Sequence, residues 1–141
     1  MKKLPVGIQS FRIVIEEDCA YADKTKDIYS LIQQGRYYFL SRPRRFGKSL
    51  LVDTMHELFS GNRELFKGLW IAGPESDYAF KPHPVVRLDM TQFGSSSASD
   101  VKSGLMALIR ENAESEQMEL KGSNPAESLA WLIRSLAAKH G

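Results

Sequence analysis

Apolar residues recur every three or four positions in four segments of the chain, and this spacing predicts four helices. It places the apolar side chains on one face of a helix, where they can pack against a core. The predicted helices cover residues 26–34, 47–60, 100–120 and 125–141. Gly35 and Gly61 follow the first two, where a glycine commonly ends a helix. Asn124, Pro125 and Glu127 open the last helix, because asparagine caps, proline suits the first helical position and glutamate completes a capping box.

Three shorter apolar runs predict strands, over residues 8–15, 37–40 and 85–88. The first run alternates apolar and polar residues unevenly, as a short strand or extended arm does. The second is aromatic and apolar, and it is too short for a buried helix. The third ends at Asp89. Strands that alternate with helices indicate an α/β fold built on a sheet.

The composition excludes several classes of protein. A chain of 141 residues, 43% of them hydrophobic, is sufficient for one domain with a core. It has no run close to the roughly 18 apolar residues of a membrane helix, and its first residues lack the apolar stretch of a signal peptide. One cysteine and three scattered histidines exclude a disulfide framework and a metal-binding cluster. We therefore expect a cytoplasmic protein with no membrane partner.

Positive charge is concentrated in one part of the chain. No acidic residue lies between Asp27 and Asp53. The basic residues of that interval are Arg36, Arg42, Arg44, Arg45 and Lys48. Their five charges exceed the net charge of +2 for the whole chain. Such a concentration indicates an anionic partner, either the phosphates of a nucleotide or a nucleic-acid backbone.

Residues 37–60 combine an apolar run, a basic loop, a Gly-Lys-Ser triplet and a helix. This order is typical of a P-loop, in which backbone N–H groups at the helix start bind phosphates. Gly47 has no side chain, so the backbone can approach a ligand closely. Lys48 can reach the β- and γ-phosphates, and Ser49 can offer its hydroxyl to Mg²⁺. A P-loop usually begins with a glycine five positions before Gly47, where this chain has Arg42.

The stretch of residues 41–51 resembles the signature of a bacterial AAA-ATPase-like family, in which an arginine commonly replaces the first glycine of the P-loop. Further similarity lies in residues 4–11, 21–25, 65–69 and 84–89. The similarity rests on specific motifs as far as Asp89 and on a helical pattern beyond it. Members of this family commonly carry a PD-(D/E)XK nuclease-like domain downstream.

The resemblance implies an α/β fold, a P-loop NTPase-like sheet with flanking helices, of which residues 1–141 form an incomplete, N-terminal portion. Residues 1–36 are then an N-terminal arm and helix. Residues 37–61 are a strand, P-loop and helix, and residues 84–141 are a second strand followed by two helices. The acidic strand that completes a Mg²⁺-dependent ATPase is implied to follow Gly141.

The resemblance also implies that the chain binds ATP and Mg²⁺. Lys48 is then the catalytic candidate and Ser49 the metal ligand. The implied nucleotide contacts are Arg44, Arg45, Phe46, Gly47, Lys48, Ser49 and Leu50, with Tyr21 and Asp23 at the base. The residues themselves leave an alternative open, in which Asp23 or Thr25 caps the following helix and Tyr21 belongs to the core.

Asp89 is the one candidate within the chain for a Mg²⁺-binding acid, and the alternative is that it ends a strand or caps a turn. His56 and Glu57 are expected to face solvent.

Two further functions remain open: a nucleic-acid-binding module whose basic loop contacts backbone phosphates, and an inert truncated fragment. The partners that follow are an adenine nucleotide, nucleic acid through a downstream domain, and further copies of the chain if open strand edges pair.

Overall fold

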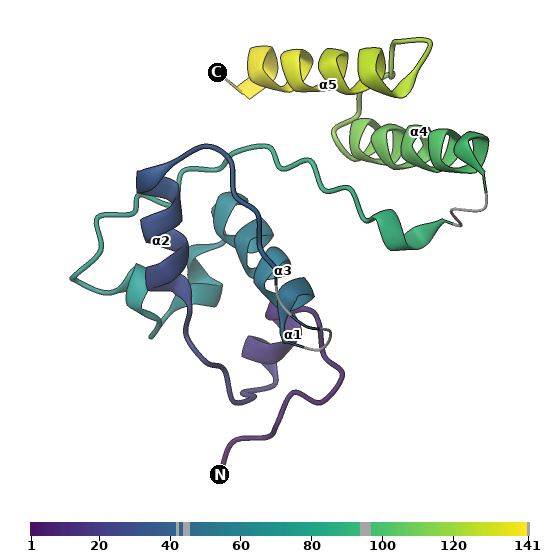
Figure 1. Cartoon of the computed structure of the whole chain (residues 1–141). Coiled ribbons are helices and arrows are strands. Elements are labelled where there is room, and N and C mark those ends of the chain that lie inside the picture. Colours follow the sequence, from purple (N-terminus) through teal and green to yellow (C-terminus); the bar gives the residue numbers. More distant parts are fainter. Residues whose placement is uncertain (42, 44–45, 94–96, 141) are drawn as a thin grey trace. The chain divides into compact units, whose positions relative to one another are not determined.

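The structure is helical in the part of the chain that it describes. A computed structural model gives residues 1–41, 43, 46–93 and 97–140. Helices account for 54% of the described residues, and no strand forms among them. The chain divides into two compact units, Met1–His83 and Pro84–Gly141, and each is described by itself (Figure 1).

Within its described residues, the first unit holds three α-helices and two short 3₁₀ helices around one apolar core (Figure 1). They are α1 (Phe11–Glu16), α2 (Thr25–Gln34), α3 (Lys48–Phe59), η1 (Arg63–Phe66) and η2 (Trp70–Ala72). The buried core consists of Phe11, Ile28, Leu58, Leu65, Phe66, Ile71 and Phe80. The rings of Phe11 and Phe66 lie 4.8 Å apart, centroid to centroid. Helix α1 packs on α3, and α2 packs on η2.

The helices predicted over residues 26–34 and 47–60 are confirmed as α2 and α3. Gly61 stands just beyond α3 with a φ of 79°, a left-handed conformation that favours glycine. A Cβ at this position would lie 3.0 Å from the carbonyl oxygen of Phe80. The glycine therefore both ends α3 and lets the chain pass close to the core.

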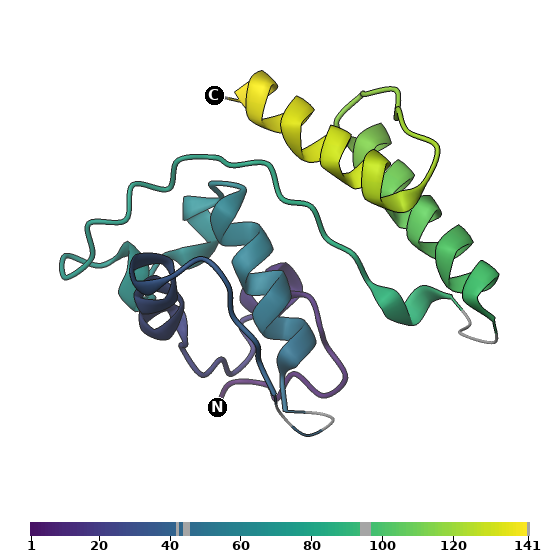
Figure 2. The ribbon, with the colours of Figure 1, turned by 45° about the horizontal axis from the view of Figure 1, so that its top comes forward.

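The second unit is a pair of helices, α4 (Ala98–Ser115) and α5 (Pro125–His140), preceded by the short 3₁₀ helix η3 (Met90–Gln92). The two helices lie side by side and run in the same direction, because residues 116–124 lead the chain back to the start of α5 (Figures 1 and 2). Their shared core contains Ile109, Ala113, Leu132 and Leu136. Helix α4 ends five residues earlier than the apolar pattern predicted, at Ser115.

The predicted start of α5 is confirmed, with one difference in detail. The side-chain oxygen of Asn124 accepts a hydrogen bond of 3.0 Å from the backbone N–H of Glu127. The Glu127 carboxylate accepts from the backbone N–H of Ser123, at 3.1 Å, and from its hydroxyl. These hydrogen bonds lower the pKa of Glu127. The Glu127 carboxylate therefore binds the backbone N–H of Ser123, and not that of Asn124, which a capping box predicts.

The predicted α/β fold is wrong for the described part of the chain, which contains no P-loop NTPase-like sheet. The segment predicted as a strand over residues 8–15 contains α1 instead. Phe11 and Val14, three residues apart, are both buried, whereas Ile13 is exposed. This is helical spacing, and it overrides the uneven alternation that suggested a strand.

The other two predicted strands, over residues 37–40 and 85–88, are not strands in the described part of the chain. Tyr37 and Phe39 are 94% and 93% exposed. At residues 85–88, the Asn112 side chain takes the place of a neighbouring strand. Its oxygen accepts from the backbone N–H of Arg87 at 3.0 Å, and its amide donates to the Arg87 carbonyl oxygen at 2.9 Å. Apolar character alone does not make a strand, because the backbone needs a second chain segment to bond.

The N-terminal arm, defined here as residues 5–9, precedes α1 and is held at both ends. Before it, the carbonyl oxygen of Lys3 accepts a 2.7 Å hydrogen bond from the backbone N–H of Ala20, and Lys3 forms an isolated parallel bridge with Cys19. After it, the backbone N–H of Phe11 donates to the Asp53 carboxylate at 2.7 Å. The arm is thus tied to α3 and to the segment that leads into α2.

Candidate functional site

The start of α3 has the features of an anion-binding site. Gly47 precedes the helix with a φ of 72° and a ψ of 19°, in the left-handed region. The first intrahelical hydrogen bond runs from the Leu51 N–H to the Gly47 carbonyl oxygen, at 2.9 Å. The N–H groups of Lys48, Ser49 and Leu50 precede that bond, so they have no carbonyl within the helix to bond. They form the positive end of the helix dipole.

The other four α-helices of the described residues begin differently, because each receives an acceptor side chain at its first turn. The N–H donors and their acceptors are Phe11 with Asp53, Thr25 with Asp23, Asp100 with Ser97, and Glu127 with Asn124. Gly47 has no side chain that could act in this way. The residue that precedes α3 therefore adds no side-chain acceptor of its own to the first turn.

Lys48 and Ser49, in the first turn of α3, differ in how far they are exposed to solvent. Lys48 is half-buried, and its ammonium donates to the Pro43 carbonyl oxygen at 3.3 Å, so it lies against its own loop. Ser49 is exposed. Arg44 and Arg45 lie outside the described residues.

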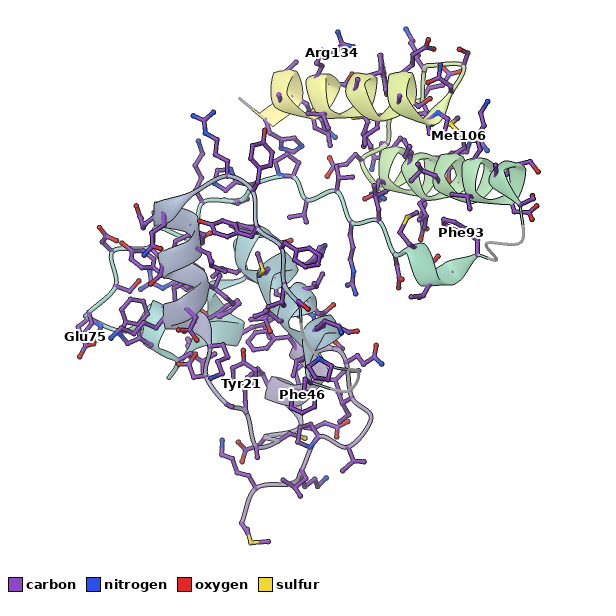
Figure 3. All side chains as sticks on the ribbon, in the orientation of Figure 1. Tyr21, Phe46, Glu75, Phe93, Met106 and Arg134 are labelled. Atoms are coloured by element: carbon purple, nitrogen blue, oxygen red, sulfur yellow. The ribbon has the colours of Figure 1, made fainter. Side chains whose placement is uncertain are left out.

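Two hollows adjoin the start of α3. The arm hollow, of about 630 Å³, lies between the N-terminal arm and residues 47–50. The aromatic hollow, of about 390 Å³, is lined by Tyr21, Phe46 and Leu50 together with other residues of the first unit. Tyr21 and Phe46 are labelled in Figure 3. Because Pro5, Gly47 and Leu50 line both, the two hollows meet at the first turn of α3.

Tyr21 joins the wall of the aromatic hollow to α3. Its hydroxyl lies 3.4 Å from the Thr54 hydroxyl, and its ring packs edge-on against Phe11 at 5.2 Å between centroids. Burial raises the pKa of Tyr21. Tyr21 is therefore packed against the core and also lines the aromatic hollow. The structure is compatible with a core position for Tyr21 and with a contact to the base.

Asp23 acts as a cap, which confirms the alternative that the sequence left open. One carboxylate oxygen accepts from the backbone N–H of Thr25 at 2.8 Å, at the start of α2. The other accepts from the backbone N–H of Trp70 at 2.7 Å, at the start of η2. Asp23 lines neither hollow. Its contact with a base stays a prediction.

Three features of the site escaped the sequence analysis. The N-terminal arm lines the larger hollow, although it carries no charged residue. Asp53 caps α1 from α3. Glu57 was expected to face solvent, but it is only 9% exposed and accepts two hydrogen bonds from Arg12, at 3.0 and 3.2 Å. Its position seven residues after Leu50 places it on the inner face of α3, and that spacing was a usable signal.

Asp89 caps a turn in the second unit. Its carboxylate accepts from the backbone N–H of Thr91 at 3.0 Å and from the Thr91 hydroxyl at 2.6 Å, and these bonds lower the pKa of Asp89. No cluster of three histidine, cysteine or acidic residues that could hold a metal occurs among the described residues.

A glycine–lysine–serine helix start that opens onto two hollows defines a candidate nucleotide-binding protein. The profile of the AAA-ATPase-like family, described as "Predicted AAA-ATPase", matches residues 5–141, and the chain belongs to this family. The resemblance found in the sequence is thereby confirmed, whereas the downstream nuclease-like domain stays a prediction.

One curated relative is "Uncharacterized protein in vnfD 5'region" of Azotobacter chroococcum mcd 1, which is 44% identical over 141 residues. The alignment covers 99% of this chain and 27% of the relative, so the chain spans about a quarter of that protein. No solved structure matches the chain significantly. Among the described residues, no helix is both long and apolar enough to cross a membrane.

Proposed function

We propose that this chain binds ATP together with Mg²⁺ at the first turn of α3. The observation that carries the proposal is the start of α3 at Gly47, where three backbone N–H groups precede the first intrahelical bond beside two hollows. Amide groups in this arrangement bind phosphate oxygens, and the helix dipole favours their negative charge. The family description supports an ATPase.

The residues at this position fit a magnesium nucleotide. In the proposed complex the Lys48 ammonium exchanges its hydrogen bond with the Pro43 carbonyl oxygen for one with a phosphate oxygen. That exchange is favourable because hydrogen bonds to phosphate are charge-assisted. Ser49 is exposed, and its hydroxyl is a suitable oxygen ligand for Mg²⁺ beside phosphate oxygens and water. When bound, Mg²⁺ neutralises the charge on the phosphates and bridges them.

In this proposal the base of the nucleotide binds in the aromatic hollow, beside the phosphates. Tyr21, Phe46 and Leu50 line the aromatic hollow, and flat apolar walls suit a purine ring. Asp23 contributes by holding the starts of α2 and η2 together through its two hydrogen bonds. Arg44 and Arg45 are proposed to add positive charge near the phosphates.

We propose ATP hydrolysis for longer members of this family, and not for residues 1–141 by themselves. The role of this chain would be to bind the triphosphate and to stabilise negative charge on it through Lys48 and the N–H groups of α3.

The proposal is tested by titrating ATP and Mg²⁺ into the chain in a calorimeter. Lys48→Ala should weaken binding by about 10- to 100-fold, since a charge-assisted hydrogen bond contributes on the order of 1.5–3 kcal/mol. The matched control is Lys67→Ala, because Lys67 is an exposed lysine that pairs only with Glu64 among the described residues. Equal ATP affinity in wild type and Lys48→Ala would refute the site.

The same variants separate nucleotide binding from binding of a nucleic-acid backbone. In the second case each basic residue contributes a similar step and the affinity falls steeply with salt. Arg36→Ala would then weaken binding of a DNA or RNA oligonucleotide about as much as Lys48→Ala does. A nucleotide site depends on Lys48 far more than on Arg36.

A further inference from the structure

The N-terminal arm forms one wall of the arm hollow, facing residues 47–50. The two walls differ in chemistry. The α3 wall carries the Lys48 ammonium and the N–H groups of the first turn. The arm contains Pro5, Val6, Gly7, Ile8 and Gln9, none of which is charged.

The arm is fixed in this position by contacts on both sides of it. Ahead of it, the Lys3 carbonyl oxygen accepts from the Ala20 N–H at 2.7 Å, and Ala20 itself lines the aromatic hollow. Behind it, α1 is held by Asp53 and by the two hydrogen bonds from Arg12 to Glu57. Both carboxylates belong to α3, so one helix positions the arm and also forms the opposite wall.

Two residues give the arm its shape and its polar groups. Gly7 has a φ of 77°, which a residue with a side chain adopts only with strain, and it follows a turn bond from the Val6 N–H to the Leu4 carbonyl oxygen of 2.9 Å. Gln9 is exposed, lines the hollow, and has no side-chain partner among the described residues. Its amide offers both a donor and an acceptor.

We propose that the arm is a second binding element of this site and takes the uncharged sugar of the nucleoside, while the phosphates lie on α3 and the base lies in the aromatic hollow. This inference rests on the proposed function. An uncharged wall of backbone groups, apolar side chains and the Gln9 amide suits a sugar, which needs hydrogen bonds to its hydroxyls and apolar surface beside its ring. The arm carries no positive charge that could bind a phosphate. The wall formed by α3 carries the Lys48 ammonium, so we assign the phosphates to α3 and the sugar to the arm.

The test compares ATP with inorganic tripolyphosphate, which carries three phosphates and no nucleoside. Both are titrated calorimetrically with Mg²⁺ into wild type, Gly7→Ala and Gln9→Ala. Gly68→Ala is the matched control, because Gly68 has a similar φ of 81° and, like Gly7, no described atom within 4 Å of an added Cβ, but it lies outside the hollow.

We expect both arm variants to weaken ATP binding by severalfold and to leave tripolyphosphate binding unchanged. Gly68→Ala should change neither. Gln9→Ala keeps the test valid if the strain in Gly7→Ala disturbs folding, since the Gln9 side chain forms no hydrogen bond among the described residues.

The possible failures are distinguishable. If both arm variants bind ATP as wild type does, the inference about the arm is wrong and the proposed function stands. If the arm variants weaken ATP and tripolyphosphate equally, the arm does not take the nucleoside part, and the inference is again wrong. If wild type binds neither ligand, the proposed function fails, and the inference fails with it.

Discussion

The Asp53 carboxylate accepts a 2.7 Å hydrogen bond from the backbone N–H of Phe11, a residue 42 positions earlier in the chain. Asp53 lies in α3, and Phe11 is the first residue of α1. A helix of only six residues has little stability of its own, so a cap from another helix matters to it. Together with the hydrogen bonds from Arg12 to Glu57, this contact holds α1 and, through it, the end of the N-terminal arm.

Asp53→Ala should lower the free energy of unfolding by about 1 kcal/mol, because an N-cap acceptor typically contributes about 0.5–2 kcal/mol. Asp53→Asn keeps an acceptor oxygen and should recover most of the loss. Both can be measured by urea unfolding followed by circular dichroism. Glu119→Ala is the control, because Glu119 is exposed, lies outside the helices and has no partner among the described residues. A wild-type midpoint for Asp53→Ala would contradict the capping role.

Glu57→Ala should destabilise the chain by about 1.5–3 kcal/mol, since hydrogen bonds to a buried charge are stronger than average. Glu57 is 9% exposed, and its carboxylate accepts hydrogen bonds from Arg12, at 3.0 Å, and from the Asn62 amide, at 2.5 Å.

The comparison variant is Glu16→Ala. Glu16 also pairs with Arg12, at 3.6 Å, but it is exposed, so its removal should change stability by less than about 1 kcal/mol. If the two variants unfold at the same urea concentration, the buried position of Glu57 has no energetic consequence.

The pair of helices in the second unit should weaken in acid through Glu116. Hydrogen bonds from Lys139 and His140 lower the pKa of Glu116 below its ordinary value of 4.5. The unfolded chain therefore binds this proton more readily than the folded one. The stabilisation is complete above pH 4.5 and is lost as the pH falls through the lower pKa of the folded state.

Urea midpoints measured between pH 7 and pH 2 check this prediction. Glu116→Gln should show a smaller loss of stability in acid than wild type. Glu119→Gln, at an exposed carboxylate with no described partner, should follow the wild-type curve. The idea is wrong if Glu116→Gln and wild type lose stability in parallel.

Ser49→Ala should remove most of the gain that Mg²⁺ gives to ATP binding, a prediction that depends on the proposed function. With the hydroxyl gone, Mg²⁺ loses its protein ligand and keeps only phosphate oxygens and water. Lys48→Ala should instead weaken ATP with and without Mg²⁺. Calorimetric titrations in Mg²⁺ and in EDTA measure both effects. An undiminished response to Mg²⁺ in Ser49→Ala would show that another residue holds the ion.

Helices were the part of the fold that could be predicted from the sequence. The hydrogen bonds of a helix join residues four apart, so the pattern that buries one face and the caps that end it both lie within a short window. Asn124, Pro125 and Glu127 are adjacent, and the start of α5 follows from them. Gly47 and Gly61 likewise bracket α3. The Gly-Lys-Ser triplet at the start of α3, and with it the family, was visible in the same local way.

The pairing of distant segments was decided by the tertiary structure. Residues 37–40 have the composition of a strand, but a strand needs backbone partners from elsewhere in the chain, and none lies beside them in the described residues. At Arg87 the partner is the single side chain of Asn112.

The same distinction applies to the candidate site. The sequence determined that Lys48 and Ser49 follow a glycine at a helix start, because these residues are neighbours. Only the tertiary structure placed the N-terminal arm opposite them and turned Asp53 and Glu57 of α3 toward α1. The physical reason is that burial, charge pairing and capping across more than 40 residues depend on which surfaces meet. No local pattern of residues encodes that.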